Sequence, residues 1–318
     1  MCGRAVYNWG EIDTSLAQEY HYAVCRYAPL ITNRLHHYAK LVRADKPIGT
    51  ALLLWPMLWA LWIVSEGRPD WRVLLVFVVG TFLMRSAGCA INDFADRHID
   101  GSVERSQHRP IVSGAVTPKE AVMVAIVLAV VSFLLVLTMN RLTVALSFVA
   151  AGLAFLYPFT KRFTYWPQLF LGLAFGWAVP MVSAAQTGSV QPVAWLIYVV
   201  AIAWALAYDT IYAMVDRSDD LKLGVKSTAI LFGKSDVMIV MLIQIAVLIA
   251  LAVIAYSTGS GWMFAIAWVA ACGVLVRQWQ LIRTRQAAPC FNAFMLNNHM
   301  GALLFAGFLL DYLVRRVN

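Results

Sequence analysis

Residues 192–220 read PVAWLIYVVAIAWALAYDTIYAMVDRSDD. The segment 192–214 is long and apolar enough for a helix that crosses a bilayer, whose hydrocarbon core of roughly 30 Å needs about 20 such residues. The end of the stretch carries Asp209, Asp216 and Asp220. These acids share one helix face, because successive residues of a helix are about 100° apart. The stretch therefore predicts a membrane span that ends in a row of carboxylates.

The composition extends this pattern to the whole chain. Of the 318 residues, 61% are hydrophobic and only 13% are charged, whereas soluble domains have roughly 45–50% apolar residues. A soluble protein of this size needs more polar surface to cover its core, so the excess apolar surface must face lipid. The five cysteines are scattered along the chain and are interpreted as packing residues.

Apolar segments with the length of membrane spans recur along the chain after residue 46. They cover residues 47–65, 72–92, 118–138, 142–160, 166–186, 192–214, 236–257, 261–282 and 293–314. No Ser-, Gly- or Pro-rich linker divides them, so residues 47–318 are predicted to form one transmembrane domain. Pro56, Pro158 and Pro180 fall inside spans or near their ends, where we expect kinks.

The basic residues predict how the bundle is oriented. Lysines and arginines concentrate before the first span and in every second connection, and such connections face the cytoplasm. The N-terminus and both acidic ends are therefore predicted to be cytoplasmic. Basic loops beside anionic lipid headgroups also account for the net charge of +8, so no nucleic-acid partner is expected.

Residues 1–46 are predicted to form a cytoplasmic N-terminal segment. Ile31, Leu35, Tyr38 and Val42 recur with helical spacing among basic residues, which favours an amphipathic helix on the membrane surface. A solvated basic tail is the alternative. Residues 1–25 carry no readable signal.

A second acidic window, NDFADRHID at 92–100, closes the second predicted span. In a continuous helix, Asn92, Asp96 and Asp100 would share one face. Both windows contain D-R-x-x-D, beginning at Asp96 and at Asp216, and both follow an even-numbered span. This repetition favours an internal duplication that places the two motifs face to face across a cavity.

The chemistry of such a site is restricted by its charge. Several carboxylates in one pocket repel one another at low dielectric and need cations. Oxygen ligands without His or Cys clusters suit Mg²⁺, which commonly joins one or two carboxylates to substrate phosphates. Nearby basic side chains such as Arg97, Lys161 and Arg162 suit the remaining charge of a diphosphate. Loop salt bridges and helix caps are the plainer alternative, but they explain neither the repetition nor the shared side.

At these residues the sequence resembles the UbiA superfamily of intramembrane prenyltransferases. N-D-x-x-D-x-x-x-D at 92–100 and D-x-x-Y-x-x-x-D-x-x-x-D at 209–220 match its two signatures. The resemblance covers about residue 35 to the C-terminus. Five further stretches resemble one part of this superfamily, the bacterial branch that prenylates 4-hydroxybenzoate. They are RADKPIGT (43–50), AGCAINDFADR (87–97), RPIVSGAVT (109–117), YPFTKR (157–162) and GVKSTAILFG (224–233).

The resemblance implies an all-α integral membrane protein of the bacterial inner membrane, a bundle of about nine transmembrane helices with a central cavity. It also implies a Mg²⁺-dependent enzyme of ubiquinone biosynthesis. In this reaction a polyprenyl diphosphate alkylates 4-hydroxybenzoate at the ring carbon ortho to the hydroxyl and releases diphosphate. Another aromatic acceptor within the superfamily is an alternative, and a secondary transporter is the alternative from a different class.

This hypothesis assigns roles to individual residues. The predicted metal ligands are Asn92, Asp96, Asp100, Asp209, Asp216 and Asp220. The five aspartates among them are also the predicted catalytic residues, because bound Mg²⁺ promotes ionisation of the allylic C–O bond; Asp209 is in addition a candidate base. The predicted substrate contacts are Arg43, Arg97, Tyr157, Lys161, Arg162 and Tyr212. The cations would contact diphosphate or, for Arg43, the benzoate carboxylate, and the tyrosines would stabilise a carbocation. Packing, and an interfacial position for Arg43, are the alternatives.

Overall fold

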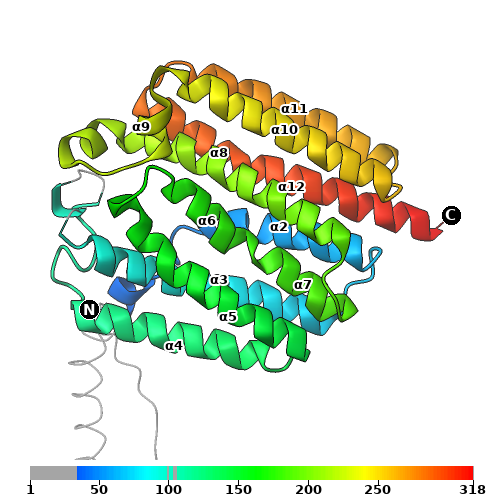
Figure 1. Cartoon of the computed structure of the whole chain (residues 1–318), viewed down its shortest axis with the longest axis horizontal. Helices are drawn as coiled ribbons and strands as arrows, with labels where there is room; N and C mark the ends of the chain where they lie inside the picture. The colour runs from blue at the N-terminus through cyan, green and yellow to red at the C-terminus, as the bar shows by residue number, and fades with distance from the viewer. Residues whose placement is uncertain (1–33, 99, 103–105, 318) are drawn as a thin grey trace, which may run out of the picture.

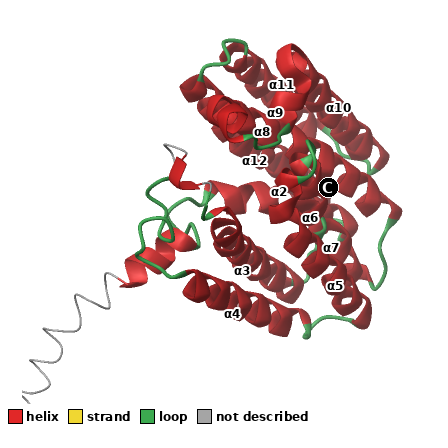
Figure 2. Cartoon of the chain, turned by 60° about the vertical axis from the view of Figure 1, so that its left-hand side comes forward, coloured by secondary structure: helices red, strands yellow, loops and turns green. Residues whose placement is uncertain are grey.

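The computed structural model of the chain describes residues 34–98, 100–102 and 106–317. The described residues form helices joined by turns and loops, with no strand among them (Figure 2). After a short helix over residues 34–41, the elements are α2 (Ile48–Val64), α3 (Trp71–Asp96), η1 (Asp100–Ser102), α4 (Pro118–Val136), α5 (Arg141–Leu156), η2 (Tyr157–Arg162), α6 (Pro167–Gly176), α7 (Ala178–Thr187), α8 (Pro192–Leu223), α9 (Thr228–Phe232), η3 (Gly233–Ser235), α10 (Asp236–Ser257), α11 (Trp262–Ile282) and α12 (Ala287–Val317).

The predicted spans agree with these helices. In the described part of the chain, 8 helical segments are long and apolar enough to cross a membrane, and α2 is a shorter apolar helix of 17 residues. The protein is therefore a multi-pass helical membrane protein. The predicted span 166–186 consists of two helices, α6 and α7, that are separated at Trp177. Pro180 explains the break, because its ring clashes with the carbonyl four residues earlier, that of Gly176, where α6 ends.

Side-chain caps define where several spans begin. At α4, the Thr117 hydroxyl accepts a bond from the Glu120 amide (3.2 Å), and the Glu120 carboxylate accepts one from the Thr117 amide (2.7 Å). Asn140 caps α5 by accepting from the Thr143 amide (2.9 Å). These bonds satisfy amides that have no partner within the helix. These caps fix where the two helices begin. Helix α4 begins at the end of the bundle that carries the acidic motifs, and α5 begins at the opposite end (Figure 1).

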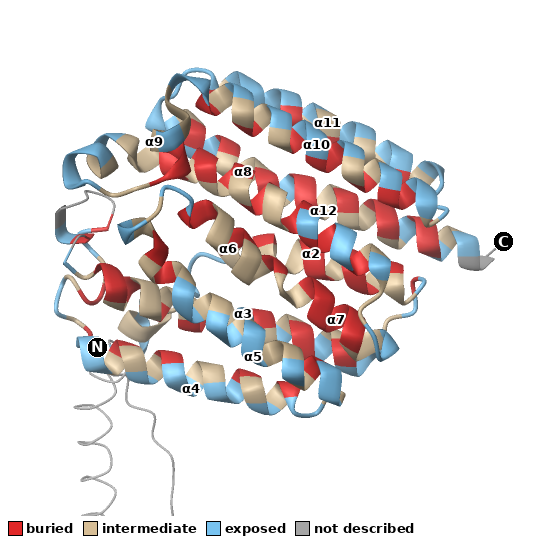
Figure 3. Ribbon diagram, viewed as in Figure 1, coloured by how far each residue is buried: buried red, intermediate tan, exposed pale blue. Residues whose placement is uncertain are grey.

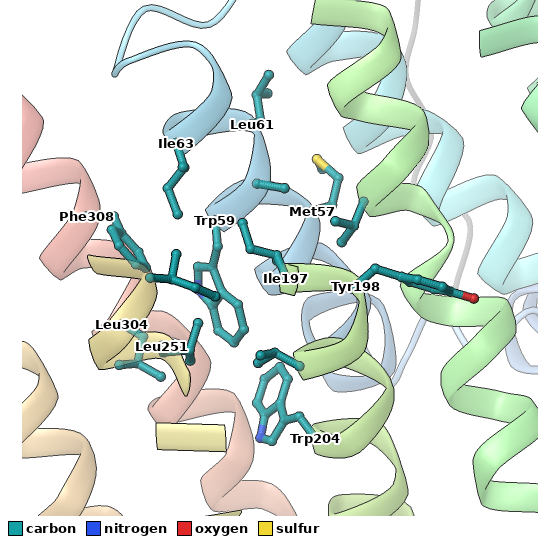
Figure 4. Close-up of a cluster of buried hydrophobic side chains, with 14 of the residues drawn as sticks. Met57, Trp59, Leu61, Ile63, Ile197, Tyr198, Trp204, Leu251, Leu304 and Phe308 are labelled. Atoms are coloured by element: carbon teal, nitrogen blue, oxygen red, sulfur yellow. The ribbon is translucent and has the colours of Figure 1, made fainter. Parts of the chain in front are cut away.

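Helices α2, α8 and α12 form the centre of the bundle, and α4 and α5 lie at its edge with mostly exposed apolar faces (Figure 3). Figure 4 shows Met57 and Trp59 of α2 against Ile197 and Trp204 of α8, with Phe308 of α12 nearby. The exposed apolar faces of α4 and α5 fit contact with lipid. The acidic helix α8 is itself part of the buried centre.

A single turn of α12 accepts hydrogen bonds from three indole N–H groups. Trp55 donates to Asn298 (2.9 Å), Trp59 to the Gly301 carbonyl (3.2 Å), and Trp204 to Asn297 (3.2 Å). A Cβ atom at position 301 would overlap the Trp55 and Trp204 rings, so glycine is required there. Because Trp55 and Trp59 belong to α2 and Trp204 to α8, this turn fixes the spacing between the two helices.

A small apolar cavity of about 10 Å³ lies between α2, α6 and α8, with Pro56, Phe175, Trp204 and Tyr208 among its lining residues. Tyr208 precedes Asp209 directly in the sequence, so one lining residue of this cavity is adjacent to the second acidic motif along α8.

The short helix over residues 34–41 packs on the protein through Leu41, which is fully buried against α3 and α4. Arg34 and Tyr38 both bond Glu120, at 2.5 and 3.1 Å, while Leu35 is exposed. The predicted amphipathic helix is thus helical where it is described, and its membrane contact stays a prediction. Ile31 and the tail before it lie outside the described residues.

Candidate active site

The first acidic motif does not continue as one helix. Helix α3 ends at Asp96, and Asp100 begins the separate 3-10 turn η1. The prediction that Asn92, Asp96 and Asp100 share one helix face is therefore wrong for Asp100. Arg97 ends the helix, since its guanidinium bonds the Phe94 carbonyl (2.7 Å) and lies 4.4 Å from the Phe94 ring centre. Arg97 thus contacts its own helix.

Ion pairs hold the acids of the first motif together. Asp93, only 1% exposed, lies 2.7 Å from Arg43 Nη2 and 3.1 Å from Arg109 Nη1. Arg109 also bonds Asp100 at 2.5 Å. Burial raises the pKa of Asp100 above its ordinary value, and the positive charge of Arg109 opposes that rise. Asp93 is thus the centre of the cluster, although its place off the main helix face gave little sign of this in the sequence.

Asp96 belongs to the same cluster through Lys161. The two side chains form a salt bridge in which Asp96 is 2% exposed. Lys161 lies on η2, which is tied to α3 a second time because Arg162 donates to the Ala95 carbonyl (2.6 Å). The segment YPFTKR therefore brings its lysine against the end of α3, and Lys161, a predicted diphosphate contact, lies at the first acidic motif.

The strained backbone of Arg43 has an identifiable support. Arg43 has a positive φ of 56°, which is uncommon for a residue with a side chain. Arg85 donates to the carbonyls of Val42 (3.2 Å), Arg43 (3.0 Å) and Lys46 (3.3 Å). A Cβ at Gly49 would overlap the Arg85 guanidinium. A lone arginine inside a predicted span was the sequence signal for this support, and it holds Arg43 in reach of Asp93.

The second acidic motif lies on one continuous helix. Asp209, Asp216 and Asp220 all belong to α8, which runs to Leu223 and ends at Gly224, whose φ of 68° suits glycine. The prediction of a single helical face is therefore confirmed for these three acids. The ring centre of Tyr212, between them in sequence, lies 4.8 Å from that of Phe294 on α12.

Segment η2, which begins at Tyr157, connects the two motifs. Its Lys161 side chain pairs with Asp96 of α3, and the Lys161 carbonyl accepts from the Lys226 amide that follows α8 (3.4 Å). The two motifs therefore lie at one end of the bundle, although 120 residues separate Asp96 from Asp216 in the sequence. The connections that follow α3 and α8 lie at that same end, on the left of Figure 1.

The connection after α8 also contacts η2 and α6. The Lys226 amide donates to the Lys161 carbonyl (3.4 Å), and the Thr228 amide donates to Gln168 Oε1 (3.1 Å). Thr228 and Thr210 bond through their hydroxyls at 2.6 Å. The GVKST segment therefore fixes the end of α8 against η2 and α6. Gln168 gave no sequence signal, because a single glutamine in an apolar span has no distinctive spacing.

The oxygen atoms of the first motif fit a divalent cation. Asp93 Oδ2 and Asp96 Oδ1 are buried, and among the described residues neither has a hydrogen-bond partner. Nowhere in residues 34–98, 100–102 and 106–317 do three His, Cys, Asp or Glu side chains gather closely enough to hold a metal ion. A pair of carboxylates with free oxygens suits Mg²⁺, because this ion usually takes one or two carboxylates and completes its shell with water and phosphate oxygens.

The fold and the site define an intramembrane enzyme of the prenyl-transfer class. The model of the UbiA prenyltransferase family matches residues 53–301. The chain belongs to this family. Its membership removes the support for the secondary-transporter alternative, because the two acidic motifs that suggested a transporter are those of the matched region.

The similar proteins agree with this assignment. The chain is 55% identical over 276 residues to the 4-hydroxybenzoate octaprenyltransferase of Psychromonas ingrahamii, covering 87% of this chain and 96% of that protein. It is 56% identical over 283 residues to the protein of the same name from Methylococcus capsulatus, covering 89% and 97%. Both matches therefore cover most of this chain and nearly all of the relative.

Solved structures share the fold. A UbiA homolog from Aeropyrum pernix, in its apo form, has a TM-score of 0.73 at 23% identity, covering 83% of this chain and 98% of that chain. A UbiA homolog from Archaeoglobus fulgidus bound to GPP and Mg²⁺ has a TM-score of 0.69 at 17% identity, covering 87% and 99%. At such identities the likeness shows the helical architecture alone.

Proposed function

We propose that this protein transfers a polyprenyl group from polyprenyl diphosphate to the carbon of 4-hydroxybenzoate ortho to its hydroxyl, in ubiquinone biosynthesis. The observation that carries the proposal is that η2 lies between the two carboxylate motifs, because Lys161 pairs with Asp96 of the first motif and its carbonyl accepts from the Lys226 amide that follows the second. The choice of acceptor is supported by the relatives at 55% and 56% identity that are named 4-hydroxybenzoate octaprenyltransferase.

The proposal includes Mg²⁺ as the cofactor, and the Archaeoglobus homolog bound to GPP and Mg²⁺ supports it. Bound Mg²⁺ would neutralise the negative charge that develops on the departing diphosphate. The proposed ligands are Asn92, Asp96 and Asp100 from the first motif and Asp209, Asp216 and Asp220 from the second. Among these ligands, Asp96 has a buried carboxylate oxygen, Oδ1, that has no hydrogen-bond partner among the described residues and could bind a cation.

The basic residues of the site would bind the diphosphate. Lys161, Arg43 and Arg109 pair with carboxylates, and a diphosphate offers them more acceptor oxygens at a higher charge. Their transfer to the substrate would leave Asp96 and Asp100 free to hold a cation.

The walls of the site would protect the allylic cation. Tyr157 begins η2 and Tyr212 lies between Asp209 and Asp216 on α8, and aromatic faces near a site stabilise positive charge. Apolar side chains of α2, α6 and α8, among them Pro56, Phe175 and Trp204, would exclude water from the reacting carbon. Asp209 is proposed to take the proton that the ring loses, since it is the acid of the second motif that lies deepest along α8.

The proposed orientation places the N-terminus and the acidic end of the bundle in the cytoplasm, in the bacterial inner membrane. The basic connections are the support for this orientation. A cytoplasmic site would receive soluble 4-hydroxybenzoate from water and the polyprenyl chain from the lipid.

The experiment is a transfer assay on the purified protein in detergent, with labelled 4-hydroxybenzoate and polyprenyl diphosphates of several lengths. We expect the label to enter a lipid-extractable product only when Mg²⁺ is present, and chelation by EDTA to stop the reaction reversibly. Product without added metal after chelation would contradict the metal assignment. Release of diphosphate with a different aromatic acceptor, but not with 4-hydroxybenzoate, would replace the proposed acceptor.

A further inference from the structure

A second pocket lies at the same end of the bundle, behind α8. It has a volume of about 320 Å³ and is bounded by the last turns of α8 and the first residues of α10 and α12. Its walls include Met214, Arg217, Leu221, Asp236, Arg285 and Ala287. Apolar and cationic side chains therefore line one hollow, and none of its residues belongs to the site described above.

The position of these residues around α8 separates the pocket from the acidic motif. At about 100° per residue, Arg217 lies about 80° around the helix from Asp209, Leu221 about 120° and Ser218 about 180°. Asp216 and Asp220 lie within about 20° of Asp209 by the same measure. The pocket and the acids of the second motif are thus on different faces of one helix.

The charges of the pocket leave an excess positive charge. Asp236 is fully buried and lies 3.0 Å from Arg217 Nη1 and 2.8 Å from Arg285 Nη2. Its Oδ1 also accepts from the Val237 amide (2.7 Å). Two guanidinium groups thus face one carboxylate whose two oxygens both accept bonds. Since each guanidinium has five N–H donors, donors remain for a further anion.

The cationic pair is fixed in position before any ligand arrives. Arg285 has a positive φ of 52°, a backbone conformation that costs energy for a residue with a side chain and is found at ligand clamps. Its guanidinium also donates to the Lys234 carbonyl (2.7 Å). The turn between α11 and α12 is therefore held against the start of α10 in a single arrangement.

The surroundings place the pocket at the edge of the bilayer. At the end of α11, the Arg283 guanidinium lies 5.4 Å from the Trp279 ring centre, a combination of residues typical of the membrane interface. Leu221 is 60% exposed, and along α10 Met238 is 60% and Leu242 58% exposed. Apolar surface is therefore exposed at Leu221, which lines the pocket, and along α10, whose first residue also lines it.

We propose that this pocket binds an anionic phospholipid. The lipid phosphate would lie against Arg217 and Arg285, and its acyl chains would follow the exposed face of α10. Charge complementarity supports this occupant, because the pair of arginines outweighs Asp236. The exposed apolar side chain of Leu221, which lines the pocket beside them, supports it as well. The proposal does not rest on the proposed catalytic function.

The test measures lipid binding by the full-length protein without any prenyl substrate. Protein in a neutral detergent is titrated with phosphatidylglycerol, with phosphatidylcholine or with inorganic phosphate, and bound molecules are counted by native mass spectrometry. We expect phosphatidylglycerol to saturate a single site at least tenfold more tightly than phosphatidylcholine. Equal binding of both lipids would overturn the proposal, and so would equally tight binding of inorganic phosphate, which would indicate a site for free anions.

Two variants locate the site. Ala287→Trp fills the pocket and leaves the arginines paired with Asp236, whereas Arg217→Gln removes one cation and leaves Arg285 on Asp236. Each is expected to weaken phosphatidylglycerol binding at least tenfold. Ala151→Trp, on the exposed face of α5, is the matched control and should bind as the unchanged protein does. Unchanged binding in both pocket variants would overturn the assignment even if the protein prefers phosphatidylglycerol.

Discussion

The D-R-x-x-D sequence occurs twice in this protein, and the two copies have different structures. At Asp96–Asp100 the helix ends within the motif, so Asp100 leaves the face that carries Asp96. At Asp216–Asp220 the helix continues to Leu223, and the acids stay on one face. The topological equivalence of the two copies therefore does not extend to their local geometry.

The arginine of each motif shows the same difference. Arg97 bonds the Phe94 carbonyl of its own helix and covers the Phe94 ring. Arg217 instead bonds Asp236 at the start of α10, on another face of α8 from the acids. One arginine ends a helix and the other joins two helices. A short repeated motif thus specifies which groups are present, while the neighbouring helices decide which contacts they make.

The largest expected effect is the loss of turnover when either motif loses an acid. Asp96→Asn and Asp216→Asn should each lower kcat by at least about 10²–10³-fold, the cost of removing a group that stabilises developing charge. Both proteins should still purify as folded monodisperse species, because asparagine conserves the shape of aspartate. The measurement is the transfer assay at saturating donor and Mg²⁺.

Asp219→Asn is the control for both variants. Asp219 pairs with exposed Lys222 at 3.4 Å, one turn away on α8, so it should keep nearly full activity. Near-normal turnover in one of the two test variants would show that the corresponding motif does not hold the metal. The two motifs would then differ in function as well as in geometry.

A smaller loss is expected from the cation of the first motif. Lys161→Met removes the partner of Asp96 and a proposed diphosphate contact. A hydrogen bond to a charged group contributes about 1.5–3 kcal/mol, so kcat/KM for the donor should fall roughly 10–100-fold. Steady-state kinetics with varied donor measure this change. Lys222→Met, whose lysine side chain is 75% exposed, is the matched control, and equal losses in the two variants would argue against a specific role for Lys161.

The ion pairs of the first motif also predict coupled binding. Because Lys161, Arg43 and Arg109 occupy the carboxylates, Mg²⁺ and a diphosphate should each bind better when the other is present. Coupling between sites is typically about 5–150-fold. Calorimetric titration with Mg²⁺, with and without inorganic pyrophosphate, measures it, and the reverse titration must give the same factor. Identical Mg²⁺ affinities in the two titrations would mean that the basic residues do not move from acid to ligand.

The smallest expected effect concerns stability at Asp100. Burial raises the pKa of Asp100, so the stabilising contribution of its protonated form is complete below about pH 3.9 and is lost as the pH rises through the folded-state pKa. Asp100→Asn should therefore melt at the same temperature as the unchanged protein near pH 4, and up to about 2–4 °C higher at pH 8. Thermal unfolding in detergent at both pH values tests this. A lower melting temperature for the variant at pH 8 would show that the pairing of Asp100 with Arg109 outweighs its burial.

Much of the architecture follows from the sequence, because a bilayer imposes its thickness on every span. The nine predicted segments correspond to α2 to α12, and even the break between α6 and α7 follows from Pro180. The ladder on α8 was equally accessible, since helical spacing alone puts Asp209, Asp216 and Asp220 on one face. These are local properties, and local sequence is sufficient to predict them.

Only the tertiary structure showed where α3 ends and what surrounds its acids. The spacing from Asn92 to Asp100 fits a helix, but Arg97 and the turn η1 end it at Asp96. The partners of Asp93 are Arg43 and Arg109, which lie 50 residues before it and in the following loop. Likewise, Arg217 is visible in the second motif, but the sequence did not predict that it shares Asp236 with Arg285 on another face of α8.

The sequence by itself determined the spans, the two acidic motifs and the family to which they point. The packing of distant helices decided which charges neutralise one another, because such pairings depend on which side chains meet in space and not on their spacing along the chain.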